Sequence, residues 1–363
     1  MPLSEFSIID RYFIAPARPC AREFSAVTPG FLPSGDTSTS CTSSMHVKRD
    51  PVQTGNLVLG IGDDAALIEP PSGEVLAISV DTLVAGRHFP EQTSPADIGY
   101  KALAVNLSDM AAMGATPRWA TLSLALPEVD EGFLQPFSDH FLQLAQQYDV
   151  ALIGGDTVRG PLTITVQIIG TVPADKALKR SGAKVGDAIF VSGSLGDAAK
   201  GLSLIFDGYQ NSDDERYLVK RLNRPTARIE LGEALRDLAT SAIDISDGLL
   251  ADLGHILEQS GVGAEITSDK IPCSDALLNI LPNSSDRIQL MVTGGDDYEL
   301  CFTVPALRID EVNLIAERLA LPLTQIGSIS KGSSLLLDGV KIEQQGFDHF
   351  KVECHEGHED HGK

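Results

Sequence analysis

Apolar and polar residues alternate along several segments in the first half of the chain, which is typical of half-buried β-strands. Residues 74–84 ("EVLAISVDTLV") alternate like a strand that we expect to end at Asp81, and further strands are expected over 116–127 and 162–172. Residues 150–160 ("VALIGGDTVRG") are expected to form a short strand that runs into a glycine turn. These segments predict a β-sheet.

A helical spacing of apolar residues appears between these strands. Residues 95–115 ("PADIGYKALAVNLSDMAAMGA") predict a helix with Pro95 near its start and Gly114 at its end. Residues 131–149 predict a second helix that contains one proline. Strands and helices therefore interleave, which favours an α/β arrangement.

The second half repeats this interleaving. Strands are expected over 188–193 and 298–305, and helices over 195–206 and 248–261. The fold class that we predict is α/β (α+β), with two domains of mixed sheets flanked by helices. The domains are expected to cover 1–172 and 173–351.

Two segments differ in composition from the rest. Residues 15–56 are dense in Pro, Ser, Thr and Gly without a sustained period, and we interpret them as a flexible insertion. Residues 352–363 ("VECHEGHEDHGK") are expected to form a disordered tail.

Composition narrows the cellular setting. No apolar run is as long as a bilayer span, and the start of the chain lacks the pattern of an export signal. The five cysteines are scattered and form no CxxC pair, which argues against a structural zinc site and favours a reducing compartment. We therefore expect a cytoplasmic protein.

The charge balance limits the partners. The chain has 28 basic and 50 acidic side chains, a formal net charge of −22. Such a surface repels nucleic acid and anionic lipid, so neither nucleic acid nor a membrane is an expected partner. A polyphosphate ligand would have to bind together with cations, which makes divalent metal a natural companion.

Acidic residues recur where an apolar segment meets a turn. Asp63 and Asp64 stand side by side in "GIGDDAAL", and two carboxylates about 4 Å apart repel by about 4 kcal/mol at an effective dielectric of about 20. Magnesium ions take oxygen ligands and share them with phosphates, so common Mg²⁺ ions would remove this repulsion. The other acids in such positions are Asp81, Asp109, Asp156, Asp244, Asp247, Asp296 and Asp297.

Each of these positions has a simpler interpretation. Gly and Asp favour tight turns, and Ser246 or Asp247 could cap the helix that begins at Gly248. A dinucleotide site is a further alternative, because "GIGDDA" matches G-x-G-x-x-A. We reject it because Pro70 and Pro71 follow too soon for the required helix. The P-loop, protein-kinase and calcium-loop motifs are absent from the sequence.

The motifs taken together resemble the thiamine-monophosphate kinase family, within the aminoimidazole ribonucleotide synthetase superfamily. The resemblance covers nearly the whole chain outside 15–56 and the tail, in family order. Its most specific stretches are "KALAVNLSDMAAMGA" and "IDISDGL"; others are "SVDTLVAGRHF", "LIGGDTVRGP" and "GGDDYELCF".

The resemblance implies ATP-dependent phosphorylation of thiamine monophosphate to thiamine diphosphate with several Mg²⁺ ions. It implies a homodimer whose N-terminal domains, which bind ATP and metal, pair their sheets. The active sites would lie between the N- and C-terminal domains.

The same resemblance implies roles for individual residues. Asp109, Asp156 and Arg180 are the expected catalytic residues, and Gly155, Asp156, Arg180 and Ser246 the expected ATP contacts. His88, Asp296 and Phe347 are expected to bind thiamine monophosphate. The expected metal ligands, direct or through water, are Asp64, Ser79, Asp81, Asp109, Asp156, Asp244 and Asp247.

The chain departs from the family pattern at two of these motifs. Asp296 stands where the family usually has Glu, and Val158 stands where Thr is common. Because the phosphate of thiamine monophosphate is largely ionised near pH 7, we expect direct in-line transfer without a strong base or a phosphoenzyme. Two alternatives stay open from the residues alone: another ATP-using enzyme of the superfamily, and a non-catalytic acidic protein that binds divalent cations.

Overall fold

The computed structural model describes residues 8, 10–14, 56–208 and 210–342. Residues 15–55, Phe347 and the tail, on which several expectations fall, lie outside this part of the chain. The N-terminal domain contains, in chain order, η1 (Asp10–Ile14), β1 (Leu57–Leu59), β2 (Leu67–Ile68), β3 (Glu74–Val84), α3 (Pro95–Ala112), β4 (Thr116–Leu126), α4 (Glu131–Gln147), β5 (Ala151–Arg159) and β6 (Thr163–Pro173).

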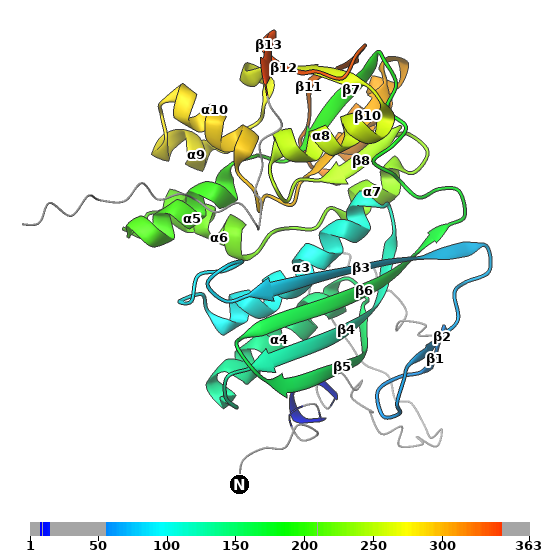
Figure 1. Cartoon of the computed structure of the whole chain (residues 1–363), viewed down its shortest axis with the longest axis vertical. Helices are drawn as coiled ribbons and strands as arrows, with labels where there is room; N and C mark the ends of the chain where they lie inside the picture. Colours follow the sequence, from blue (N-terminus) through cyan, green and yellow to red (C-terminus); the bar gives the residue numbers. More distant parts are fainter. Residues whose placement is uncertain (1–7, 9, 15–55, 209, 343–363) are drawn as a thin grey trace, which may run out of the picture.

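Four of these strands form a mixed sheet in the order β3-β6-β4-β5, and α3 and α4 cover one of its faces (Figure 1). β6 is antiparallel to β3 and to β4, whereas β4 and β5 are parallel. The side chains of Leu83, Leu122 and Val166 point to the helices and are buried. The opposite face carries the β1–β2 hairpin, which packs around Trp119 and Ile169. We refer to these as the helix face and the outer face.

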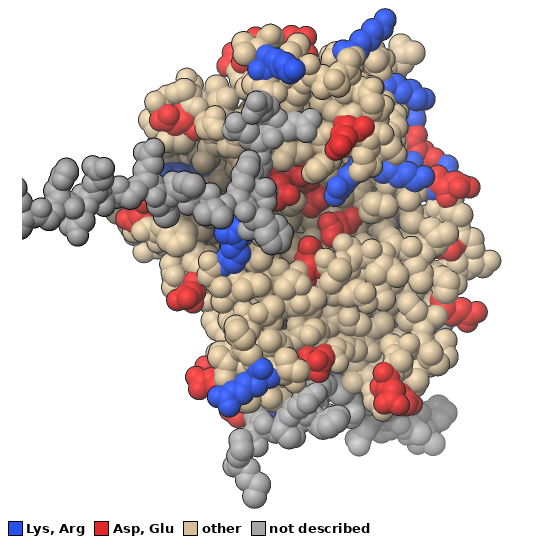
Figure 2. Space-filling view, viewed as in Figure 1, with Lys and Arg blue, Asp and Glu red and all other residues tan. Residues whose placement is uncertain are grey.

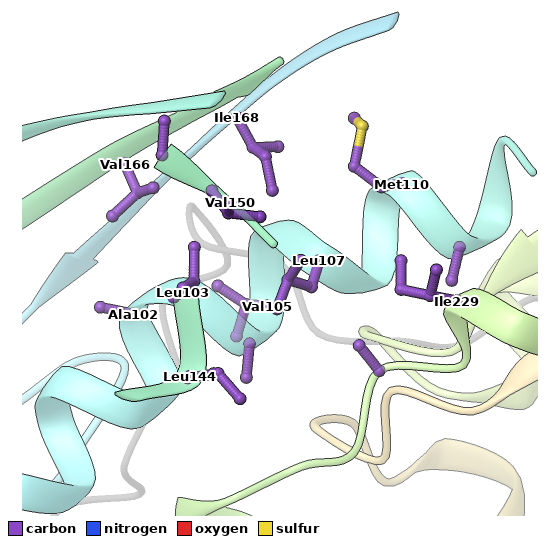
Figure 3. Packing of buried hydrophobic residues seen from close by; sticks show 14 of the residues in the cluster. Ala102, Leu103, Val105, Leu107, Met110, Leu144, Val150, Val166, Ile168 and Ile229 are labelled. Carbon is purple, nitrogen blue, oxygen red and sulfur yellow. The ribbon is translucent and has the colours of Figure 1, made fainter. Parts of the chain in front are cut away.

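Helix α3 of the N-terminal domain packs against the C-terminal domain. The Ser94 side chain caps its start by accepting a hydrogen bond from the Asp97 N–H at 3.2 Å, and Pro95 occupies the first turn, where its missing N–H costs nothing. Leu103 and Leu107 are fully buried; each contributes about 1.5–3 kcal/mol by leaving water. Figure 3 shows α3 between the sheet and Ile229 of the C-terminal domain.

A glycine allows a close approach between the domains. At Gly232, a β-carbon would lie 2.0 Å from the carbonyl oxygen of Ala111, near the end of α3. A larger residue would therefore push the two domains apart at this point.

The C-terminal domain contains a seven-stranded sheet in the order β13-β12-β9-β11-β7-β10-β8, in which only the β12–β9 pair is parallel among the described strands. Its elements are β7 (Asp187–Ser192), α5 (Asp197–Asp207), α6 (Asp213–Asn223), α7 (Ile229–Leu235), β8 (Ser241–Asp244), α8 (Leu249–Ser260), β9 (Gly263–Ile266), η2 (Ser268–Lys270), α9 (Asp275–Ile280), α10 (Ser284–Thr293), β10 (Leu300–Pro305), η3 (Ala306–Arg308), α11 (Ile309–Leu319), β11 (Leu323–Ser330), β12 (Leu335–Leu337) and β13 (Val340–Ile342).

The predicted fold class, two domains of mixed sheets flanked by helices, is confirmed, but three local expectations were wrong. Strand β3 continues to Val84 instead of ending at Asp81, because its full length pairs with β6. Asp109 lies inside helix α3, and Asp156 lies inside β5, which pairs with β4 through the predicted glycine turn. In the described part of the chain no helix is long and apolar enough to cross a membrane.

Candidate active site

Three aspartates from three elements meet in the space between the domains. Asp81 lies on the helix face of β3, Asp109 on α3, and Asp244 at the end of β8. The Ser79 hydroxyl donates to Asp109, and the Ser108 hydroxyl donates to Asp244 at 2.8 Å. Figure 2 shows acidic side chains gathered in the hollow between the domains.

The electrostatics of this cluster favour a positive ligand. Burial, reinforced by the negative charge of Asp109, raises the pKa of the Asp81 carboxyl to about 7. Burial and the charge of Asp109 likewise raise the pKa of Asp244 to about 8. Burial also raises the pKa of Asp109, against the lowering effects of the Ser79 hydrogen bond and of nearby Arg180. A cation would offset both the burial of these carboxylates and the repulsion between them.

Arg180 lies on the exposed connection between β6 and β7, close enough for its charge to act on Asp109. Its backbone is held by the Ser260 hydroxyl, which donates to the Arg180 carbonyl oxygen at 3.3 Å. The guanidinium is therefore an exposed positive group at the edge of an acidic cluster, which is an arrangement suited to a phosphate.

The loop between β8 and α8 carries Ser246 and Asp247, both half-buried. The Asp252 carboxylate, one turn into α8, accepts hydrogen bonds at 3.1 Å from the backbone N–H groups of Ser246, Asp247 and Gly248. Burial, together with the charge of Asp247, raises the pKa of Asp252 to about 7. Asp252 thus fixes the conformation of the loop that carries the predicted ATP and metal contacts.

The "GGDDYEL" loop before β10 is joined to this β8–α8 loop. The Asp296 N–H donates to the Ser246 carbonyl oxygen at 2.8 Å, and the Tyr298 N–H donates to that of Ile245 at 2.8 Å. A β-carbon on Gly295 would lie 2.4 Å from the Ser246 carbonyl oxygen, so only glycine allows this approach. The two loops therefore form one structural unit.

Buried charges hold the second loop in place. The Asp297 carboxylate accepts the backbone N–H of Gly196 at 2.7 Å, and Glu299 is fully buried. Glu299 pairs with Arg221 at 2.9 Å and with Arg228 at 2.5 Å. These contacts anchor the loop to α5 and to the chain around α6.

His88 lies in the turn after β3. Its Nδ1 accepts a hydrogen bond from the Val84 N–H at 2.9 Å. In the neutral ring the proton is therefore on Nε2, which makes Nε2 a donor. The Lys101 ammonium donates to the His88 carbonyl oxygen at 3.4 Å and pairs with Asp296 at 3.1 Å.

The structure does not bring the remaining predicted residues to this cluster within one chain. Asp156 on β5 is paired with Ser123 on β4, which is in turn paired with Thr165 on β6. The side chains of these three residues lie on the outer face of the sheet. Asp64 is exposed in the β1–β2 hairpin, which also packs on the outer face. Gly155 lies beside Asp156 in the edge strand β5, and Phe347 lies outside the described residues.

The oxygen donors of the cluster fit magnesium better than zinc. The side chains present are carboxylates and a serine hydroxyl, which are hard ligands. Within the described residues, however, no three His, Cys, Asp or Glu side chains approach closely enough to enclose a metal ion by themselves. This suits a cation that takes its other ligands from phosphates and water.

Lys101 and Asp252 were missed by reasoning from the sequence. Lys101 is a charged residue in the otherwise apolar part of α3, seven and eight residues before Ser108 and Asp109, and so on the same helix face. That spacing was the available signal. For Asp252 the only signal was an acid in the first turn of a helix, which is common at helix starts.

Comparisons with known proteins agree with this geometry. The family model described as AIR synthase related protein, N-terminal domain, matches residues 62–172, and the corresponding C-terminal domain model matches residues 184–338. Thiamine-monophosphate kinase from Salmonella typhimurium is 51% identical over 298 residues, which cover 80% of this chain and 91% of that protein.

Two solved structures are similar along most of their length. The crystal structure of thiamine-monophosphate kinase from Stenotrophomonas maltophilia K279a has a TM-score of 0.76 and 49% identity, covering 79% of this chain and 92% of that one. AaThiL complexed with AMPPCP and TMP has a TM-score of 0.70 and 35% identity, covering 80% and 92%. The chain belongs to the thiamine-monophosphate kinase family of AIR synthase related proteins.

Proposed function

We propose that this chain transfers the γ-phosphoryl group of ATP directly to the phosphate of thiamine monophosphate and so makes thiamine diphosphate. The observation that carries the proposal is the convergence of Asp81, Asp109 and Asp244 in the hollow between the domains. The relative AaThiL was solved with AMPPCP, an ATP analogue, and TMP.

Mg²⁺ is the metal that the donor set supports. Ser79, Asp81, Asp109 and Asp244 would hold it from one chain, with Asp247 on the neighbouring loop. Bound there, the ion would neutralise the negative charge of the phosphates, which is the main electrostatic obstacle in joining two anions.

The residues of the chain have separate tasks in this reaction. Arg180 offers a positive group to the ATP phosphates, and the Ser246 loop, held by Asp252, positions the nucleotide. His88 presents its Nε2 donor to the phosphate of thiamine monophosphate, while Asp296 contacts the thiamine. The acceptor phosphate is already ionised near pH 7, so no group has to remove a proton from it.

We also propose that the enzyme is a homodimer formed through the outer faces of the N-terminal sheets. Among the described strands, β3 and β5 pair on one side only and form the two edges of the sheet. The outer face near β3 exposes apolar side chains, a feature typical of an interface. These exposed residues are Leu76, Ile78 and Val80 on β3, with Val158 on β5.

The dimer would also explain the scattered acids. Asp64 and Asp156 lie on the outer face, whereas Asp81 and Asp109 lie on the helix side of the same sheet. If a two-fold axis sets β3 of one chain beside β5 of the other, Asp156 of the second chain approaches the cluster of the first. We propose that the second chain supplies Gly155, Asp156 and Asp64 to each site.

The limits of the two domains and the cellular location of the protein are also proposals. We infer an N-terminal ATP- and metal-binding and dimerisation domain over 1–172 and a C-terminal domain over 173–351. The absence of CxxC pairs and the acidic charge support a cytoplasmic enzyme without nucleic-acid or membrane partners.

One assay tests the function. The protein is incubated with ATP, Mg²⁺ and thiamine monophosphate, and the product is separated and identified; thiamine diphosphate is expected. Thiamine in place of its monophosphate should give no product, and chelation of the metal should stop the reaction. Metal binding without ATP turnover would instead support a non-catalytic protein. A phosphorylated protein trapped by rapid quenching would contradict direct transfer.

A further inference from the structure

A buried lysine lies between two residues that are proposed to bind thiamine monophosphate. Lys101 projects from α3, and its side chain is only 3% exposed. A buried ammonium is costly unless it is paired, so its partners show what it stabilises.

These partners come from both domains. The Lys101 Nζ lies 3.1 Å from Asp296 Oδ1 in the C-terminal domain and donates to the His88 carbonyl oxygen at 3.4 Å in the N-terminal domain. One side chain on α3 therefore connects the turn that carries His88 with the loop that carries Asp296.

Asp296 is held in an unusual conformation. Its φ is +66°, in the left-handed region, and Tyr298, two residues later, has a φ of +51°. Such backbone angles are rare for residues other than glycine and persist only when surrounding contacts hold them. The Asp296 N–H donates to the Ser246 carbonyl oxygen at 2.8 Å, which is one such contact. Asp296 is nevertheless 31% exposed, so its carboxylate can still meet a ligand.

We propose that Lys101 is a positioning residue for the acceptor substrate. Its ammonium holds one oxygen of Asp296 and the carbonyl of His88, and thereby fixes the distance between the group that contacts thiamine and the group that contacts its phosphate. The inference rests on the proposed function, because it assigns Lys101 a task at that same site. The proposal also accounts for the aspartate at position 296, where the family usually has glutamate. The shorter aspartate side chain already places one carboxylate oxygen 3.1 Å from the Lys101 ammonium.

The test compares Lys101→Met, Asp296→Asn and the double variant. Lys101→Met keeps the length of the side chain but leaves Asp296 without its ion pair, so the melting temperature should fall. The double variant removes both charges, and its melting temperature should recover toward that of the parent chain. Lys176→Met is the matched control, since Lys176 pairs with Asp237 in an exposed position, with side chains 46% and 72% exposed.

Steady-state kinetics give the decisive readout. In Lys101→Met and in the double variant, the KM for thiamine monophosphate should rise by about tenfold or more through misplacement of binding groups. The KM for ATP should stay within about twofold, since Lys101 contacts the Asp296 side chain and the His88 carbonyl oxygen, while the backbone hydrogen bonds that join the Asp296 and Ser246 loops are unchanged. Lys176→Met should change neither constant.

Two results would overturn the inference. One is a double variant that regains stability and binds thiamine monophosphate like the parent chain, which would make the pair purely structural. The other is an equal rise of both KM values. A parent chain that makes no thiamine diphosphate is a separate outcome, because it removes the proposed function and this inference with it.

Discussion

At the scale of single residues, two of the three acids of the cluster, Asp109 and Asp244, accept a hydrogen bond from a serine hydroxyl that orients the carboxylate. Ser79 donates to Asp109, and Ser108 donates to Asp244. These hydroxyls offset little of the repulsion between the carboxylates, since burial still raises the pKa of Asp81 and Asp244 to about 7 and about 8. The cluster is therefore arranged for ligand binding at some cost to stability.

The Asp109→Asn variant should separate the contribution of this acid to activity from its cost to stability. We expect kcat to fall by about two orders of magnitude or more, because a proposed ligand of the Mg²⁺ that would neutralise the reacting phosphates is lost. The melting temperature should stay the same or rise, since the amide no longer repels Asp81 and Asp244. Asp139→Asn, on the exposed side of α4, is the control and should leave kcat unchanged. Full activity of Asp109→Asn at normal magnesium would contradict the site.

His88→Ala should affect one substrate. The KM for thiamine monophosphate is expected to rise about tenfold, because one charge-assisted hydrogen bond to its phosphate is lost. The KM for ATP should change much less. Initial rates with each substrate varied in turn measure both constants. His255→Ala, on the exposed side of α8, serves as the control. An equal effect on the two substrates would show that His88 supports the fold of the turn and makes no specific contact.

At the scale of elements, the two loops beside the cluster form one hydrogen-bonded unit. The loop with Asp296 is paired with the loop with Ser246 by backbone hydrogen bonds, and each is anchored by a buried acid, Asp297 or Asp252. The residues that we propose to contact thiamine and ATP are therefore joined by backbone hydrogen bonds.

Gly295→Ala tests this connection. The added β-carbon would lie 2.4 Å from the Ser246 carbonyl oxygen, so the loops must move apart. We expect the KM values for ATP and for thiamine monophosphate to rise together, by up to about a hundredfold for a displacement near 1 Å. Gly132→Ala, where the new methyl group meets only the side chain of Asp130, is the matched control. A change confined to one substrate would mean that the loops respond independently.

Most helices and strands could be predicted from the sequence, but which face of the sheet each acidic side chain occupies could not. Apolar periodicity located α3, α4, β4 and β6 within a few residues, because these elements bury one side against the core. It ended β3 early at Asp81, since a polar residue inside a strand resembles a strand end when its partner strand is unknown. That Asp81 and Asp156 point to opposite faces follows from the register of four strands, which is a tertiary property.

At the scale of the whole molecule, the predicted site residues of the N-terminal domain lie on two opposite faces of its sheet, the helix face and the outer face. Ser79, Asp81, Asp109 and Asp244 converge in one chain, whereas Asp64 and Asp156 do not join them. The motifs that carry the family resemblance include both sets. The dimer that we propose, with the outer face of one chain against that of another, would reconcile the two observations.

Val80→Asp should break this dimer. Val80 lies on the outer face of β3 and is 56% exposed in the single chain. A buried, unpaired carboxylate at the interface should give monomers in light scattering and an enzyme with strongly reduced kcat. Leu314→Asp, on α11 and 63% exposed, is the control and should stay dimeric and active. A dimer that survives Val80→Asp would place the interface elsewhere.

Subunit complementation decides whether the two chains share each site. Asp109→Asn and Asp156→Asn chains should each be inactive alone. In a mixed dimer with shared sites, one site receives Asp109 from one chain and Asp156 from the other, both unchanged. Random exchange of subunits should then restore about a quarter of the parent activity, since half of the dimers are mixed and half of their sites are intact. If both aspartates act within one chain, no intact site forms, and the mixture stays inactive.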